Sequence, residues 1–322
     1  MSIMSTMRKL ELAFLFLLFV SCQRDARQQS GGDTERDALR VAVMPTVGCL
    51  PFYVAQQAHI FDSLGVDVEL TTYQAQMDID TAIARGHVDV AYSDLIRAML
   101  LQESGTQVYV AGEAEAGLTL ITARRGRVRN LSQLKERMVA MARHSITDYW
   151  CDRLADTASL ARTDFFRPQI NSLRIRRDMI LAGTMDAAFL PEPQATMTSL
   201  LRHRRNFSTS KLSPRLGAWV VTDTTRSGQL ALLWKSYMLA ARGIAGRSNV
   251  SEVTQLLREH YSIPDSLADT LSNIVTTKLL RVPERMPERP SADAVQKALR
   301  WLDSRSLRSK GYNADTLIIQ AN

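Results

Sequence analysis

The 322-residue chain carries 40 Lys and Arg against 33 Asp and Glu, a formal net charge of +7, and 45% of its residues are hydrophobic. Basic residues form only short clusters, at residues 124–125, 174–177 and 202–205, without interleaved aromatics. This pattern argues against nucleic-acid binding and favours solvated faces. The composition is that of a globular protein, long enough for one large or two medium lobes.

The N-terminal residues predict export. Arg8 and Lys9 precede an apolar run at residues 12–20, which is too short to span a bilayer at about 20 residues but suits a secretory signal. A small residue, Ser21, stands before Cys22 at the end of this run, an arrangement that resembles a bacterial lipobox. We expect a lipoprotein signal peptide over residues 1–21, lipidation of Cys22 and a flexible polar tether over 22–38. The alternative is an ordinary signal peptide with a chance cysteine.

The first segment after the tether alternates between strand and helix periodicity. Such alternation predicts an α/β fold with a parallel sheet covered on both faces, and ligands bind such sheets beyond the carboxyl ends of the strands. The predicted strands are residues 39–44, 66–70 and 88–92, and the predicted helices are 51–64 and 77–85.

A second α/β lobe is predicted over residues 118–197, so the first lobe would comprise 39–117 and 198–322. After residue 92, the predicted strands are 107–111, 118–122, 138–142, 186–190 and 217–222. The predicted helices are 131–137, 148–156, 177–182, 229–245, 251–260, 266–277 and 292–302. Cys49 and Cys151 would then lie in different lobes, either as a disulfide that restricts opening or as buried free thiols.

Five segments together resemble the solute-binding proteins of ABC importers, in the branch for nitrate, sulfonates, taurine and thiamine precursors. They are residues 39–43, 50–55 with 60–61, 66–69, 82–91 and 181–193, the last with Gly183, Asp186-Ala187-Ala188 and Glu192-Pro193. The resemblance implies a type 2 periplasmic binding fold: two lobes, each a mixed, mostly parallel sheet flanked by helices, joined by a two-stranded hinge. It also implies a small-molecule ligand and an ABC permease with its ATPase as partners. Together with the lipobox-like arrangement at Cys22, it leads us to expect a lipid-anchored protein on the periplasmic face of the bacterial envelope.

Loops that follow predicted strands of the first lobe supply candidate ligand contacts. Unpaired N–H groups at a helix N-terminus would face the crevice, and a glycine would let a ligand approach the backbone closely. An ordinary strand-to-helix turn is the alternative, and a serine there could merely cap a helix. The candidates are Thr46, Val47, Gly48, Tyr92, Ser93 and Asp94, with Trp219 as an aromatic wall.

The second lobe repeats this arrangement on the opposite wall. His144, Ser145 and Thr147 follow a predicted strand and precede a helix. Glu192 stands between Pro191 and Pro193, which restrict the backbone on both sides. We expect its carboxylate at the point where the chain crosses back, either accepting a hydrogen bond from a ligand or exposed at the hinge.

Enzymatic interpretations find little support. The chain has no glycine-rich dinucleotide motif, no phosphate-loop lysine motif, no HExxH and no nucleophile elbow. Thiamine-pyrimidine synthases share the implied fold, but their cysteine-rich motif is absent, with Cys49 alone near the comparable loop. We expect a binding protein without catalysis, cofactor, metal or nucleic-acid partner. A sensor or accessory lipoprotein without transport remains an alternative, and the charge of the ligand stays open.

Overall fold

The computed structural model describes residues 38–246, 250–309 and 316–318. The predicted signal peptide, Cys22 and the tether up to residue 37 therefore lie outside the described residues. Within the described ranges, no helix combines the length and apolar character that a membrane crossing requires.

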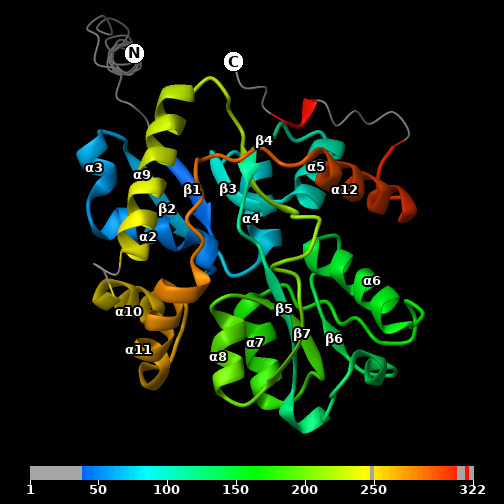
Figure 1. The fold of residues 1–322 in the computed structure, drawn as a ribbon. Helices are drawn as coiled ribbons and strands as arrows, with labels where there is room; N and C mark the ends of the chain where they lie inside the picture. Colours follow the sequence, from blue (N-terminus) through cyan, green and yellow to red (C-terminus); the bar gives the residue numbers. More distant parts are fainter. Residues whose placement is uncertain (1–37, 247–249, 310–315, 319–322) are drawn as a thin grey trace, which may run out of the picture. The chain divides into compact units, whose positions relative to one another are not determined.

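The first sheet has five strands in the order β2-β1-β3-β9-β4 (Figure 1). Strand β1 is parallel to β2 and β3, whereas β9 is antiparallel to both of its neighbours, β3 and β4. The strands β1, β3 and β9 are rich in buried Val, Ala and aromatic residues, as expected for central strands. The bounds are β1 (Leu39–Val43), β2 (Val68–Thr72), β3 (Val90–Asp94), β4 (Tyr109–Glu113) and β9 (Gly217–Val221).

Helices pack in two groups around this sheet, one formed by α2, α3 and α9 and the other by α4, α5 and α12 (Figure 1). The single helix predicted over 51–64 is two helices, because His59 adopts a left-handed conformation with φ 53°. The bounds are α2 (Leu50–Gln57), α3 (Ile60–Leu64), α4 (Gln76–Ala84), α5 (Leu95–Glu103), α9 (Ser227–Ala245) and α12 (Ala292–Ser304). A further group comprises α10 (Val250–Glu259), α11 (Asp265–Ile274) and the π-helix η4 (Val275–Leu279).

The second sheet has the order β6-β7-β5-β8, in which β5 is antiparallel to β7 and β8 while β6 is parallel to β7. It reaches beyond residue 197, the predicted end of the second lobe, because β8 pairs with β5. The chain therefore crosses between the sheets at residues 114–117 and 209–216. The strands are β5 (Leu118–Thr122), β6 (Val139–Ala140), β7 (Ala187–Pro191) and β8 (Arg204–Ser208), and the helices are α6 (Ile146–Ala158), α7 (Leu173–Ala182) and α8 (Gln194–Leu200).

Both lobes have dense apolar interiors. Cys49 and Cys151 are each fully buried and free, so the disulfide alternative does not apply. Burial raises the pKa of both thiols to about 12, which keeps them protonated and unreactive at neutral pH.

Candidate ligand-binding cleft

Two adjoining cavities lie between the lobes, and Thr46 and Pro191 line both. One, the hinge cavity, has a volume of about 160 Å³ and includes the crossing residues Glu115 and Gly117. The other, the helix cavity, has a volume of about 70 Å³ and lies at the N-termini of α5 and α6. Both meet the carboxyl ends of β1 and β7, where ligands of α/β proteins bind.

Polar side chains at the two helix N-termini form much of the helix cavity. Asp94 caps α5 by accepting a hydrogen bond from the Arg97 N–H at 3.0 Å. Ser145 caps α6 by accepting from the Thr147 N–H at 3.1 Å. The hydroxyls of Ser145 and Thr147 also bond the backbone of Ala142, at 2.8 and 2.9 Å. The caps hold the predicted site residues Asp94 and Ser145 at the wall of the helix cavity.

Asp94 links the two lobes. Its second carboxylate oxygen accepts a hydrogen bond from the Ile146 N–H at 3.1 Å, so it occupies part of the N-terminus of α6. Burial raises the pKa of this carboxyl to about 6, and the positive charge of Arg97 only partly opposes that effect. A carboxylate from the first lobe therefore takes the place that a ligand anion could occupy at this helix end.

Arg176 supplies a buried positive charge on the same cavity wall, and it was not among the predicted site residues. Its side chain donates to the backbone carbonyls of Ile170, Asn171 and Phe189 at 3.1, 3.4 and 3.1 Å. It forms no ion pair with a carboxylate in the described part of the chain, and burial lowers its pKa to about 10. The sequence does contain a pattern that predicts the burial of Arg176. Leu173 lies three residues before it and Ile180 four residues after it, which places the arginine on the buried face of α7.

The loop between β1 and α2 supplies a buried hydroxyl, that of Thr46, without a hydrogen bond of normal geometry within the described ranges. This hydroxyl lies beside the Cys49 thiol and the Tyr92 phenol. The neighbouring Val47 N–H does not point at free space as predicted, because it donates to the Glu192 carbonyl at 2.9 Å.

Position 48 has no room for a side chain, because the crossing segment at Glu115 packs directly against Gly48. A Cβ at this position would lie 2.6 Å from the Glu115 carbonyl oxygen, which is too close for any side chain. We predicted that a ligand would approach the backbone at Gly48 closely. In the structure the backbone of the crossing segment at Glu115 makes this close approach, although Gly48 still lines the hinge cavity.

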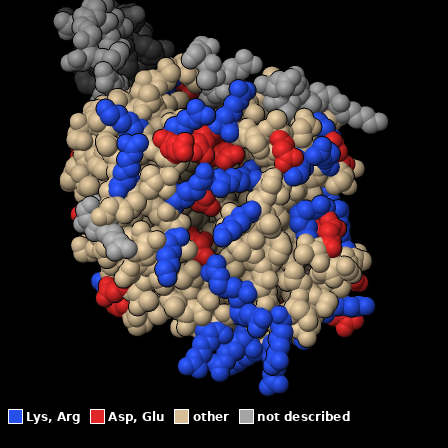
Figure 2. All heavy atoms as spheres, in the orientation of Figure 1, with Lys and Arg blue, Asp and Glu red and all other residues tan. Residues whose placement is uncertain are grey.

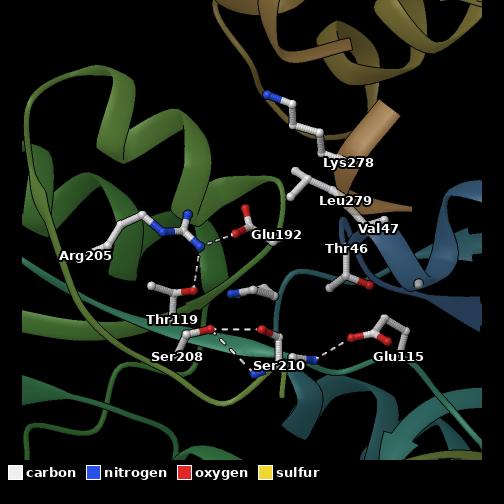
Figure 3. Close-up of a pocket in the computed structure, with 13 residues that line it drawn as sticks. Thr46, Val47, Glu115, Thr119, Glu192, Arg205, Ser208, Ser210, Lys278 and Leu279 are labelled. Atoms are coloured by element: carbon white, nitrogen blue, oxygen red, sulfur yellow. Dashed lines mark hydrogen bonds and ion pairs between the residues drawn. The ribbon is translucent and has the colours of Figure 1, made fainter. Parts of the chain in front are cut away.

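The carboxylate of Glu192 is engaged within the protein (Figure 3). One oxygen pairs with Arg205 at 2.7 Å and the other accepts from the Thr196 N–H at 3.0 Å. Arg205 also donates to the Thr119 hydroxyl at 3.0 Å. Glu192 lies between β7 and α8, not where the chain crosses back, which corrects the predicted location. Lys278, on the opposite wall, is exposed and forms no ion pair within the described residues (Figure 3).

Two predicted residues are not part of these cavities. Trp219 is 1% exposed and packs edge-on against Tyr92 and Phe52, with ring centroids 5.4 and 5.2 Å away. It therefore packs against Tyr92 without lining either cavity. His144 lines a separate cavity of about 440 Å³ with Arg97 and Arg143. Tyr92 does line the helix cavity, and its hydroxyl donates to the Glu115 carbonyl at 2.9 Å.

The described residues offer no metal site, because no three His, Cys, Asp or Glu side chains among them lie close enough to hold an ion. Residues 53–260 match the protein family described as "ABC transporter, phosphonate, periplasmic substrate-binding protein". The chain belongs to this family. Its members are transport binding proteins, and the match confirms the predicted class: a periplasmic solute-binding protein of the ABC-importer type.

Solved structures support the fold. The aliphatic sulphonate binding protein SsuA from Escherichia coli is 16% identical, with a TM-score of 0.70 over 88% of this chain and 92% of that one. The alkanesulfonate-binding SsuA from Xanthomonas axonopodis, bound to MOPS, is 15% identical, with a TM-score of 0.71 over 90% and 100%. The nitrate-binding NrtA from Synechocystis is 13% identical, with a TM-score of 0.66 over 87% and 83%. No curated protein sequence matches this chain significantly.

Proposed function

We propose that this binding protein captures a small organic anion with a phosphonate or sulfonate head group in the helix cavity and delivers it to an ABC permease driven by an ATPase. The observation that carries this proposal is Arg176, a buried guanidinium on the cavity wall without a carboxylate partner in the described ranges. A buried charge is unfavourable unless it is paired. An anionic ligand would supply the missing negative charge.

Asp94 does not cancel this charge. Its two oxygens accept N–H groups from Arg97 and Ile146, and its raised pKa brings it close to neutralisation near pH 6. The ligand class of the solved relatives, which includes sulfonate and nitrate binders, agrees with an anion in this position.

Three donors would hold the head group. Arg176 makes three hydrogen bonds to carbonyls, which leaves two of its five N–H groups for oxygen acceptors. The Ser93 hydroxyl accepts from Gln76 at 3.3 Å and keeps its own proton to donate. The buried Thr46 hydroxyl makes no hydrogen bond of normal geometry in the described residues and also reaches the hinge cavity. The organic substituent would extend into that larger cavity.

Calorimetric titration with methylphosphonate, methanesulfonate and a neutral aminopyrimidine tests the ligand class. Arg176→Met should weaken anion binding by about 10- to 150-fold, the equivalent of one charge-assisted hydrogen bond. Arg176→Lys is the matched variant, because both replacements lose the carbonyl contacts but only lysine keeps the charge, and it should retain more affinity. Equal affinities in all three proteins, or binding of the pyrimidine alone, would overturn the proposal.

We also propose that binding occurs without catalysis. The support is the absence of catalytic motifs and the character of the family. Native mass spectrometry of freshly purified protein should show a carried-over ligand of unchanged mass. A product that accumulates during incubation with pure protein would favour the enzyme alternative.

We further propose that Cys22 carries a lipid anchor. The support is the Ser21-Cys22 junction after the short apolar run. Cys22→Ser should abolish incorporation of labelled fatty acid into the exported protein. Labelling that persists in this variant would exclude the lipobox assignment and leave the ordinary signal peptide.

A further inference from the structure

Basic residues gather at the end of the second lobe that lies farthest from the cleft. Figure 2 shows Lys and Arg side chains clustered at the lower end of the molecule, below α8 and β5 as oriented in Figure 1. We call this surface the arginine end. It comprises eight exposed residues: Arg124, Arg125, Arg127, Arg129, Lys135, Arg137, Arg202 and Arg204.

Short-range contacts hold three of its segments together. The Arg124 N–H lies 3.3 Å from His203 Nδ1, and Thr122 pairs with Arg204 across β5 and β8. Arg137 forms an ion pair with Asp186 at 3.3 Å. Clusters that are separated in sequence at 124–125 and 202–205 therefore form one exposed surface.

This surface is poorly neutralised. Residues 124–137, 183–186 and 202–204 contain the eight basic residues against two acidic ones, Glu136 and Asp186. The difference of six nearly equals the net charge of +7 for the whole chain. Of the eight, Arg137 alone forms an ion pair within the described residues. So concentrated a charge attracts anionic surfaces and disfavours contact with cationic ones.

Exposed apolar side chains border the arginine end. Leu200 and Leu201, 40% and 42% exposed, immediately precede Arg202. Phe166 is 62% exposed, and its N–H donates to the Arg137 carbonyl at 2.8 Å, next to the 37% exposed Met138. Basic residues bordered by exposed leucine and phenylalanine are typical of surfaces that lie on anionic lipid head groups with apolar side chains at the acyl boundary.

The geometry of the sheet keeps this surface away from the ligand. Thr122, at the end of β5, adjoins the arginine end, whereas Thr119 at the other end of the strand lines the hinge cavity. In β7, Ala187 follows Asp186 and Pro191 lines both cavities. A flat surface bound to the arginine end would therefore leave the cleft uncovered.

We propose that the arginine end is a docking surface for an anionic phospholipid membrane, on which the second lobe rests with its cleft open to solvent. Charge complementarity and the apolar border carry this proposal. It depends neither on the ligand class nor on the lipid anchor.

The test is sedimentation of the full chain with vesicles of phosphatidylcholine, alone or mixed with phosphatidylglycerol. One variant replaces four basic residues of the arginine end by glutamine: Arg124, Arg125, Arg202 and Arg204. The matched control replaces four exposed basic residues elsewhere by glutamine: Arg85, Arg174, Lys235 and Arg285. All three proteins keep the same N-terminal apolar run, so that run cancels in the comparison.

The arginine-end variant should lose at least about tenfold in partitioning onto anionic vesicles, since each basic residue near such a surface contributes several-fold. The control should stay within about twofold, and added salt should abolish the difference. Unchanged partitioning of the arginine-end variant, or an equal loss in both variants, would overturn the proposal, including the case in which the surface binds an acidic protein instead. Anion affinity should be unchanged in both variants, which separates this result from the test of Arg176.

Discussion

Two buried carboxylates, Asp94 and Asp152, each join the two lobes, but their partners differ in charge. Asp94 reaches from the first lobe to the neutral N–H of Ile146 in α6. Asp152, on α6, is contacted from α12 by Trp301 Nε1 at 2.8 Å and Arg305 Nη2 at 2.7 Å. The first contact lies at the helix cavity, and the second involves helix α12.

The pKa values of these groups shift in opposite directions. Burial raises the pKa of Asp94 to about 6 because neutral donors and Arg97 only partly compensate for lost hydration. Burial also acts to raise the pKa of Asp152, but hydrogen bonds from Arg167, Arg305 and Trp301 outweigh it and the pKa is lowered. The comparison shows that cationic partners keep one lobe contact ionised, while the other can change charge near neutral pH.

The largest effect is expected for Asp152→Asn. The substitution leaves the Arg167 and Arg305 charges without their main partner in a buried site, so the free energy of unfolding should fall by about 3 to 5 kcal/mol. Urea unfolding at pH 7 measures it. Asp156→Asn on the same helix removes an exposed ion pair with Arg153 and should change stability by less than about 1 kcal/mol. Equal effects in the two variants would contradict the assignment of Asp152 as a paired buried charge.

A smaller, pH-dependent effect is expected at Asp94. Because its pKa is about 6 in the folded protein against an ordinary 3.8, the folded state binds the proton more tightly than the unfolded state. Stability contributed by this group is therefore present below about pH 4 and lost as pH rises through 6, by about 3 kcal/mol. Asp94→Asn should remove this slope. Unfolding free energies of both proteins between pH 4 and 8 measure it, and identical pH profiles would exclude the raised pKa.

Asp152 has the opposite pH dependence. Because its pKa is lowered in the folded protein, it stabilises the fold at pH values above the ordinary pKa of an aspartate, and this stabilisation is lost on acidification. When the unfolding free energy of Asp94→Asn is subtracted from that of the wild type at each pH, the contribution of Asp152 cancels, because both proteins contain Asp152. The contribution of Asp94 is thus isolated within one pair of titrations.

Much of the fold was predictable because its central strands have strong local patterns. The predicted strands at 39–44, 88–92 and 217–222 correspond to β1, β3 and β9 within two residues. Strand β8 was missed since it is an edge strand, and its sequence from Arg204 to Ser208 is largely exposed and lacks alternating apolar residues. The break at His59 carries no glycine or proline to signal it.

The site was predictable only where position in the fold decides it. Thr46 and Ser145 follow strands and Ser93 lies near the carboxyl end of β3, so topology alone places them at the cavities. The expected location of Glu192 was wrong, and its ion pair could not be foreseen because its partner Arg205 lies on the unpredicted β8. Its contact with a ligand stays a prediction, since Glu192 does line the hinge cavity. A tryptophan in a central strand such as Trp219 can face either side of the sheet, and sequence does not tell which.

The position of β9 has a consequence for the order in which the protein can assemble. It lies between β3 and β4, which do not pair with each other, yet it begins at Gly217, after the strands of the second lobe. While the chain is emerging from the ribosome or from an export channel, β3 and β4 therefore have open edges until more than a hundred further residues have followed. Open strand edges recruit other chains, so an unfinished molecule is exposed to aggregation until its first half receives a strand from its last third.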